Sequence, residues 1–159
     1  MSKHQKTKNS ISIFDRLIEE HHVDGVNGVD NHKLKQIVIR DLLFLLYIPS
    51  FHYSKNDAQP VEYEKSVINY GIEPISGKRV AEIDWSHVER NIKQAILYFE
   101  PRILPSNLEV NCILGMDIKA KYNQMNIEVK GFIKSTPFPE RFVLHTNLDV
   151  ETGYFKLTN

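Results

Sequence analysis

Residues 84–114 read DWSHVERNIKQAILYFEPRILPSNLEVNCIL, and the hydrophobic period changes partway along this stretch. In its first half the apolar residues share one helical stripe that Asp84 can cap, and Pro101 disfavours helical geometry at the residue before it. After Pro105, apolar and polar residues alternate, which is typical of a half-buried strand. The stretch therefore predicts a helix that starts after Asp84 and stops at Glu100, followed by a strand over 108–114.

The alternation continues towards the C-terminus. Residues 125–131 and 142–148 alternate apolar and polar side chains, and residues 154–157 follow the turn candidate Glu151-Thr152-Gly153. Short strands joined by short connections usually pair as an antiparallel meander. We expect an antiparallel sheet of three to four strands.

The N-terminal half has the patterns of helices. A capping signature at Ser12 predicts a short helix that ends near His22, and Asp30 or Asn31 can cap a second helix that Pro49 closes. A third helix is predicted over 61–70, with Gly71 as its left-handed terminator. The sequence thus predicts an α+β fold, in which three to four N-terminal helices pack on a C-terminal antiparallel sheet of three to four strands. Residues 1–9 are expected to be a flexible N-terminus, and residues 10–159 a single domain.

The composition is that of a soluble globular domain. The 159 residues are 42% hydrophobic, with 20 basic and 20 acidic side chains, so the positive field that drives binding to nucleic acid is missing. The longest apolar run, residues 42–48, is too short to span a membrane, which needs roughly 20 residues. A single cysteine allows neither an internal disulfide nor a cysteine-based zinc site. We expect a cytoplasmic protein that neither inserts into a membrane nor binds nucleic acid.

The sequence contains none of the common catalytic motifs. It has no phosphate-binding loop, nucleophile elbow or zinc-protease signature, and no pattern that predicts a cofactor or a metal. A glycosidase needs a pair of carboxylates, one with a raised pKa. The carboxylates that keep a lysozyme-like hydrolase open as the alternative are Glu19, Glu20, Glu62, Glu64, Asp84 and Glu100.

Two charged sites stand out. Asp41 falls within the apolar stripe of the second helix, so we expect it to be buried and paired with Arg102 or Arg40. Glu100 and Arg102 flank Pro101, whose fixed φ limits how both charges are presented. Glu100 also lies at the negative end of a helix dipole, which requires a cation either on a partner protein or within the domain.

Four segments, in order, carry a resemblance to a known family. They are Ser12-Ile13-Phe14-Asp15-Arg16-Leu17, Arg40-Asp41-Leu42-Leu43-Phe44-Leu45-Leu46, Ser66-Val67-Ile68-Asn69-Tyr70-Gly71 and Phe99-Glu100-Pro101-Arg102-Ile103. They resemble the TssE family, the type VI secretion baseplate relatives of the lysozyme-like wedge protein of contractile phage tails. The likeness extends from about residue 10 to the C-terminus.

The resemblance implies a structural protein without catalytic activity or cofactor. It implies that Glu100, Pro101 and Arg102 dock on a wedge core of the TssF/TssG type. From the residues themselves, we expect Asp41 and Arg40 to act as structural charges. The resemblance also implies contact with TssB/TssC-like subunits of the contractile sheath. Sheath subunits of such machines exchange strands, so an open edge of the C-terminal sheet could start sheath assembly by strand addition.

Overall fold

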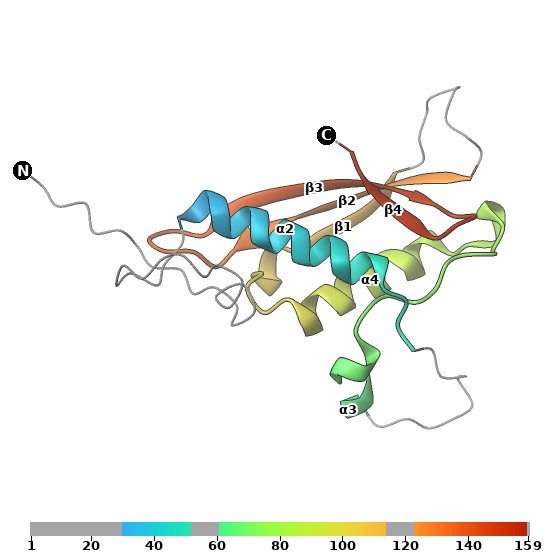
Figure 1. The fold of residues 1–159 in the computed structure, drawn as a ribbon, viewed down its shortest axis with the longest axis horizontal. Coiled ribbons are helices and arrows are strands. Elements are labelled where there is room, and N and C mark those ends of the chain that lie inside the picture. The colour runs from blue at the N-terminus through green and yellow to red at the C-terminus, as the bar shows by residue number, and fades with distance from the viewer. Residues whose placement is uncertain (1–29, 52–60, 114–122, 159) are drawn as a thin grey trace, which may run out of the picture.

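The computed structural model describes residues 30–51, 61–113 and 123–158 (Figure 1). Helix α2, Asn31–Tyr47, begins at Asp30, whose side chain accepts a hydrogen bond of 2.8 Å from the backbone N–H of Lys33. It ends where Ile48 becomes extended ahead of Pro49, because proline disfavours helical geometry in the preceding residue. The second helix expected from the sequence is confirmed.

Helix α4, Trp85–Phe99, is also confirmed. Its N-cap is Asp84, which accepts from the backbone N–H of His87 at 3.2 Å. The helix stops before Glu100, which has φ −122° and ψ 78°. One face is buried against the sheet, and it consists of Val88, Ile92, Ala95 and Ile96.

The expected third helix is wrong as a single element. The segment forms one turn of α-helix, α3 (Val61–Glu64), and one 3₁₀ turn, η1 (Val67–Asn69). Ser66 separates them: it is extended, with φ −72° and ψ 146°, and its hydroxyl accepts from the N–H of Ile68 at 3.4 Å. Serine can satisfy backbone groups outside a helix in this way, and no residue of η1 is buried to favour a longer helix.

The part of the chain that the structure describes therefore has two helices of more than one turn, rather than three to four. The expected first helix, residues 12–22, lies outside that part. Gly71 does adopt a positive φ, 128°, and brings the chain back beside the end of α2, where Ile72 donates to the Ile48 carbonyl and Ser50 to the Ile72 carbonyl.

All four expected strands are present. Strands β1 (Glu109–Ile113), β2 (Gln124–Ile133), β3 (Glu140–Asp149) and β4 (Tyr154–Leu157) form an antiparallel sheet in the order β1-β2-β3-β4. The edges are therefore β1 and β4. An isolated bridge between Ile103 and Ile133 fixes the chain after α4 to the end of β2.

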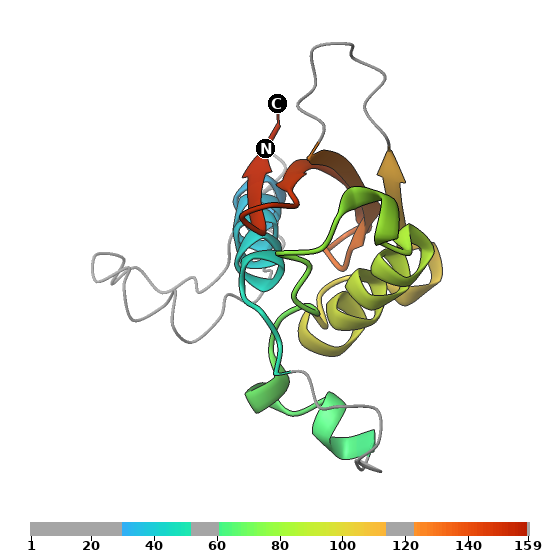
Figure 2. The same cartoon turned by 90° about the vertical axis from the view of Figure 1, so that its right-hand side faces the viewer.

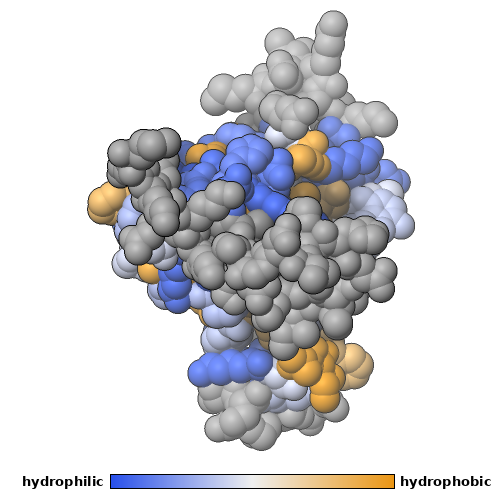
Figure 3. Space-filling model, turned by 60° about the vertical axis from the view of Figure 1, so that its left-hand side comes forward, coloured by the Kyte–Doolittle hydropathy of each residue, from blue (hydrophilic) through white to orange (hydrophobic). Residues whose placement is uncertain are grey.

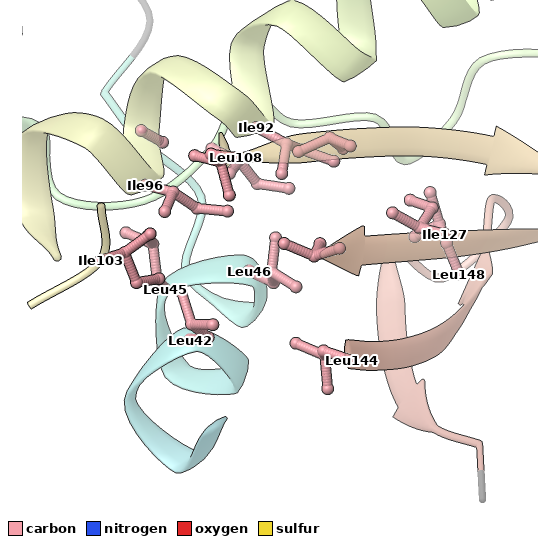
Figure 4. Packing of buried hydrophobic residues seen from close by; sticks show 14 of the residues in the cluster. Leu42, Leu45, Leu46, Ile92, Ile96, Ile103, Leu108, Ile127, Leu144 and Leu148 are labelled. Atoms are coloured by element: carbon pink, nitrogen blue, oxygen red, sulfur yellow. The ribbon is translucent and has the colours of Figure 1, made fainter. Parts of the chain in front are cut away.

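Both helices pack on the same face of the sheet. Figure 2 shows α2 below the β4 side and α4 below the β1 side, with α3 and η1 projecting away from this body. Side chains of both helices and the inner face of the strands meet in one core (Figure 4). Its fully buried members include Leu42, Leu45, Leu46, Ile92, Ile96, Ile127, Phe142, Leu144 and Leu148.

Candidate functional site

Arg102 is the centre of the charged site. After α4 ends, the chain turns at Pro101, and the carbonyl of Arg102 accepts from the N–H of Lys134 at 2.8 Å. The Lys134 side chain donates to the Pro101 carbonyl at 2.7 Å. The turn is thus held against the end of β2, and Glu100 and Arg102 point to the same side of it.

Arg102 binds Glu100 with both arms of its guanidinium. Its Nε lies 2.6 Å from Oε1 and its Nη2 lies 2.5 Å from Oε2, while its backbone N–H also donates to Oε1 at 3.2 Å. Glu100 is only 5% exposed. The charge of Glu100 is therefore met within the domain, by the arginine of its own motif.

The same guanidinium reaches helix α2. Arg102 Nη2 lies 2.5 Å from Asp41 Oδ2, and Asp41 Oδ1 accepts from Nε and Nη2 of Arg40 at 2.9 and 2.7 Å. Asp41 therefore pairs with both arginines. We refer to Arg40, Asp41, Glu100 and Arg102 as the ion-pair network.

The expectation that Asp41 is buried needs correction, because its side chain is 24% exposed. Asp41 lies at the margin of the buried face of α2, where the helix meets the turn after α4, and not at its centre. Ion pairs at such a margin retain some contact with water, which lowers both their desolvation cost and their Coulomb energy.

The network is electrostatically coupled to its surroundings. Burial lowers the pKa of Arg102, but its hydrogen bonds to Glu100 and Asp41 outweigh this effect and raise the pKa above its usual value. Burial and the charges of Asp41 and Glu100 raise the pKa of Tyr70, whose ring contacts that of Phe99 edge-on at 5.2 Å. Lys134 contacts the turn of this site, and no sequence signal indicates this residue. Tyr70 lies beside the site, in a segment that carries the family resemblance but that did not indicate a role here.

The exposed part of the motif is small. Pro101 is exposed, Glu100 is buried, and the Arg102 side chain is 24% exposed. Apolar side chains are exposed nearby in η1, where Val67 and Ile68 are 83% and 74% exposed. Figure 3 shows hydrophobic surface at the lower end of the molecule, where η1 projects.

A second notable feature is the β4 edge. The backbone N–H of Thr158 donates to the His145 carbonyl, across the antiparallel pair of β3 and β4. Along an antiparallel strand, successive N–H groups point alternately towards and away from the partner strand. The N–H groups of Phe155 and Leu157 therefore point away from β3. Neither group has a hydrogen-bond partner among the described residues. Tyr154 at the start of the strand stacks on Tyr47 of α2, with ring centroids 5.5 Å apart.

Two other carboxylates of the described residues have lowered pKa values. Burial works against ionisation of Glu73, but hydrogen bonds from His87 and Lys78 hold its pKa below the usual value. A hydrogen bond from Lys130 likewise lowers the pKa of Glu128. Within the described ranges no three His, Cys, Asp or Glu side chains could together hold a metal ion, and no helix is long and apolar enough to cross a membrane.

A family model described as baseplate wedge protein gp25 matches residues 32–137, a range that contains the ion-pair network, both long helices and the first two strands. No curated protein and no solved structure matches the chain.

Proposed function

Since the chain belongs to the gp25 family of baseplate wedge proteins, we propose that it is a structural adaptor in the baseplate of a type VI secretion system. The family is one of baseplate components of contractile, phage-tail-like machines, and a structural role follows from membership. The adaptor would dock on a TssF/TssG-type wedge core and start assembly of a TssB/TssC-like sheath. It would act in the cytoplasm and bind neither nucleic acid nor cofactor.

The turn Glu100-Pro101-Arg102 carries the docking proposal. Its two charged side chains are fixed by the ion-pair network, and its backbone is held by Lys134. A surface element that is rigid before binding loses little conformational entropy when a partner orders it. Pro101, which is exposed at the tip, is the part of the motif best able to contact the wedge core.

The β4 edge supports the sheath proposal. Its two outward N–H groups, on Phe155 and Leu157, have no partner in the described part of the chain, so an extended segment of a sheath subunit can add to the sheet there. Side chains around the edge are partly apolar, since Tyr154 and Leu157 are 51% and 53% exposed. An incoming strand would cover both.

Among the described residues, no observation favours the alternative, a lysozyme-like hydrolase; the candidate carboxylates Glu19 and Glu20 lie outside the described ranges. A glycosidase requires a carboxylic acid with a raised pKa. Glu100 and Asp41 are engaged in ion pairs, and the pKa values of Glu73 and Glu128 are lowered. We propose that the chain is not an enzyme.

The docking proposal is tested at Pro101, because changes at Glu100 or Arg102 would also disturb the fold. Pro101→Asp adds a charge at the exposed tip, and because the Pro101 side chain takes no part in the ion-pair network, we expect the network to stay intact. Pro105→Asp, at an exposed proline outside the motif, is the matched control. We expect Pro101→Asp to weaken binding to the purified wedge core by about tenfold or more, which corresponds to about 1.4 kcal/mol, while Pro105→Asp binds as wild type.

Circular dichroism spectra of both variants are compared with that of the wild type to verify that the variants are folded. Equal binding by the two would contradict docking through this turn. A parallel peptidoglycan hydrolysis assay tests the alternative function. If the protein hydrolysed peptidoglycan in a way that depends on a pair of carboxylates, and did not bind the wedge core, it would be a hydrolase and not an adaptor.

A further inference from the structure

The two edges of the sheet differ in how their backbone groups are satisfied. An edge strand presents unpaired N–H and C=O groups that can pair with any extended chain, and proteins usually protect edges that should stay free. At β1, the backbone N–H of Cys112 donates to Oε1 of Glu89 at 2.7 Å, across 23 residues of sequence. This N–H, within β1, thus points away from β2 and is already occupied. The N–H of Val110 points the same way and has no partner among the described residues, so Glu89 blocks the edge at one of these two donors.

Helix α4 positions Glu89. Trp85, which precedes Glu89 by one helical turn on the same helix face, packs against the core. Val88, just before Glu89, and Ile92, three residues after it, are buried. Figure 2 shows α4 running beside β1. The Glu89 side chain is therefore fixed along the outer side of this edge, and it is partly buried there.

The contact makes strand addition at β1 unfavourable for two reasons. An incoming strand would place a carbonyl oxygen near the Cys112 N–H. The negative carboxylate oxygen of Glu89, which already occupies this position, would repel the partial negative charge of that carbonyl oxygen. The incoming strand would also have to displace a charge-assisted hydrogen bond and leave a partly buried carboxylate without this donor. The nearness of the carboxylate is also seen in the Cys112 thiol, whose pKa burial and Glu89 raise to about 12.

We propose that Glu89 closes the β1 edge, so that the sheet accepts a partner strand only at β4. Strand β4 has no comparable device, since no described side chain hydrogen-bonds to the outward N–H groups of Phe155 and Leu157. The closure of the β1 edge depends only on residues of this chain and requires no partner protein. Its consequence, that a growing sheath can start from one side only, rests on the proposed function.

The test uses the full chain and three variants. Glu89→Ala removes the acceptor, Glu89→Met fills a similar volume without an acceptor, and Glu89→Gln retains a neutral acceptor. Two quantities are measured: amide hydrogen exchange at Cys112 by NMR, and self-association by sedimentation over a range of concentrations. Circular dichroism shows whether each variant is folded, and Glu89→Met retains the packing in case Glu89→Ala does not fold.

We expect the Cys112 amide to exchange about tenfold faster or more in Glu89→Ala and Glu89→Met, and both variants to associate as their concentration rises. The wild type and Glu89→Gln should exchange slowly and associate less than these two variants at every concentration. Unchanged exchange in the Met variant, faster exchange without association, or association of Glu89→Gln to the same extent would each overturn the closure. None of these measurements involves a baseplate protein, so they fail or succeed independently of the proposed function.

Discussion

At the scale of single residues, Arg102 makes the most connections in the site. Its side chain joins Glu100 at the end of α4 to Asp41 in α2, and its carbonyl is bound to Lys134 after β2. Three elements distant in sequence therefore meet at this one residue. Loss of function in an Arg102 variant would not by itself show that Arg102 contacts a partner, because the fold also depends on it.

We expect Arg102→Ala to lower the free energy of unfolding by about 2–4 kcal/mol, because it leaves the buried Glu100 without a counter-ion. Urea unfolding monitored by circular dichroism measures this loss. Asp41 is more exposed and keeps Arg40 as a partner, so it contributes less to the loss.

Arg40→Ala is the matched comparison. The Arg40 side chain is 46% exposed and Asp41 keeps its bond to Arg102, so the expected loss is within about 1 kcal/mol. If the two arginine variants unfolded at the same urea concentration, the structural role given to Arg102 would be incorrect.

At the scale of elements, Gly71 connects η1 to the end of α2. It has φ 128°, and a Cβ at this position would lie 2.2 Å from the Ile48 carbonyl oxygen, which is the acceptor of the Ile72 N–H. Only a residue without a Cβ allows this approach. The glycine therefore determines how the segment after η1 pairs with the chain after α2.

We expect Gly71→Ala to destabilise the protein by about 3 kcal/mol or more, since the backbone must move to relieve the contact. Gly77→Ala is the control: Gly77 also has a positive φ, 80°, but a Cβ there would meet nothing within 4 Å, so the cost should be about 1 kcal/mol. Thermal unfolding of both variants measures the difference. Equal losses would show that the close approach at Ile48 contributes nothing.

The regular elements were predictable where one physical signal dominates. Helices α2 and α4 have strong caps and one buried stripe, and the strands alternate, so local sequence contains the necessary information. The segment from α3 to η1 was not predictable by these signals. Its apolar residues have helical spacing, but Val67 and Ile68 remain exposed and Ser66 caps a separate turn.

The residues of the candidate site were predictable, and so was an ion pair of Asp41 with Arg102 or Arg40, but the combination of these contacts in one network was not. The motif indicated Glu100, Pro101 and Arg102, and the position of a carboxylate within the apolar stripe of α2 indicated Asp41. That Arg102 pairs at once with Glu100 and with Asp41 depends on how α2 packs beside the end of α4, which periodicity does not specify. The bond between Glu89 and Cys112 depends on packing of α4 against β1 in the same way.

At the scale of the whole molecule, the two helices cover one face of a sheet whose edges are chemically different. The docking turn lies at the end of α4, and the open edge, β4, lies on the α2 side of the sheet (Figures 1 and 2). The ion-pair network joins the two helices. As we propose, the protein would be an adaptor with one rigid docking turn, Glu100-Pro101-Arg102, and one edge, β4, at which an extended partner strand binds.

Sheath assembly on baseplates that contain Leu157→Pro tests the account most directly. Leu157 has an outward N–H, so proline removes the donor offered to an incoming strand and keeps the ladder to β3. Leu157→Ala, which shortens the side chain and keeps the donor, is the control. We expect both variants to enter baseplates as wild type does, and sheath to form with Leu157→Ala but not with Leu157→Pro. Sheaths of wild-type number and length on Leu157→Pro baseplates would contradict strand addition at β4.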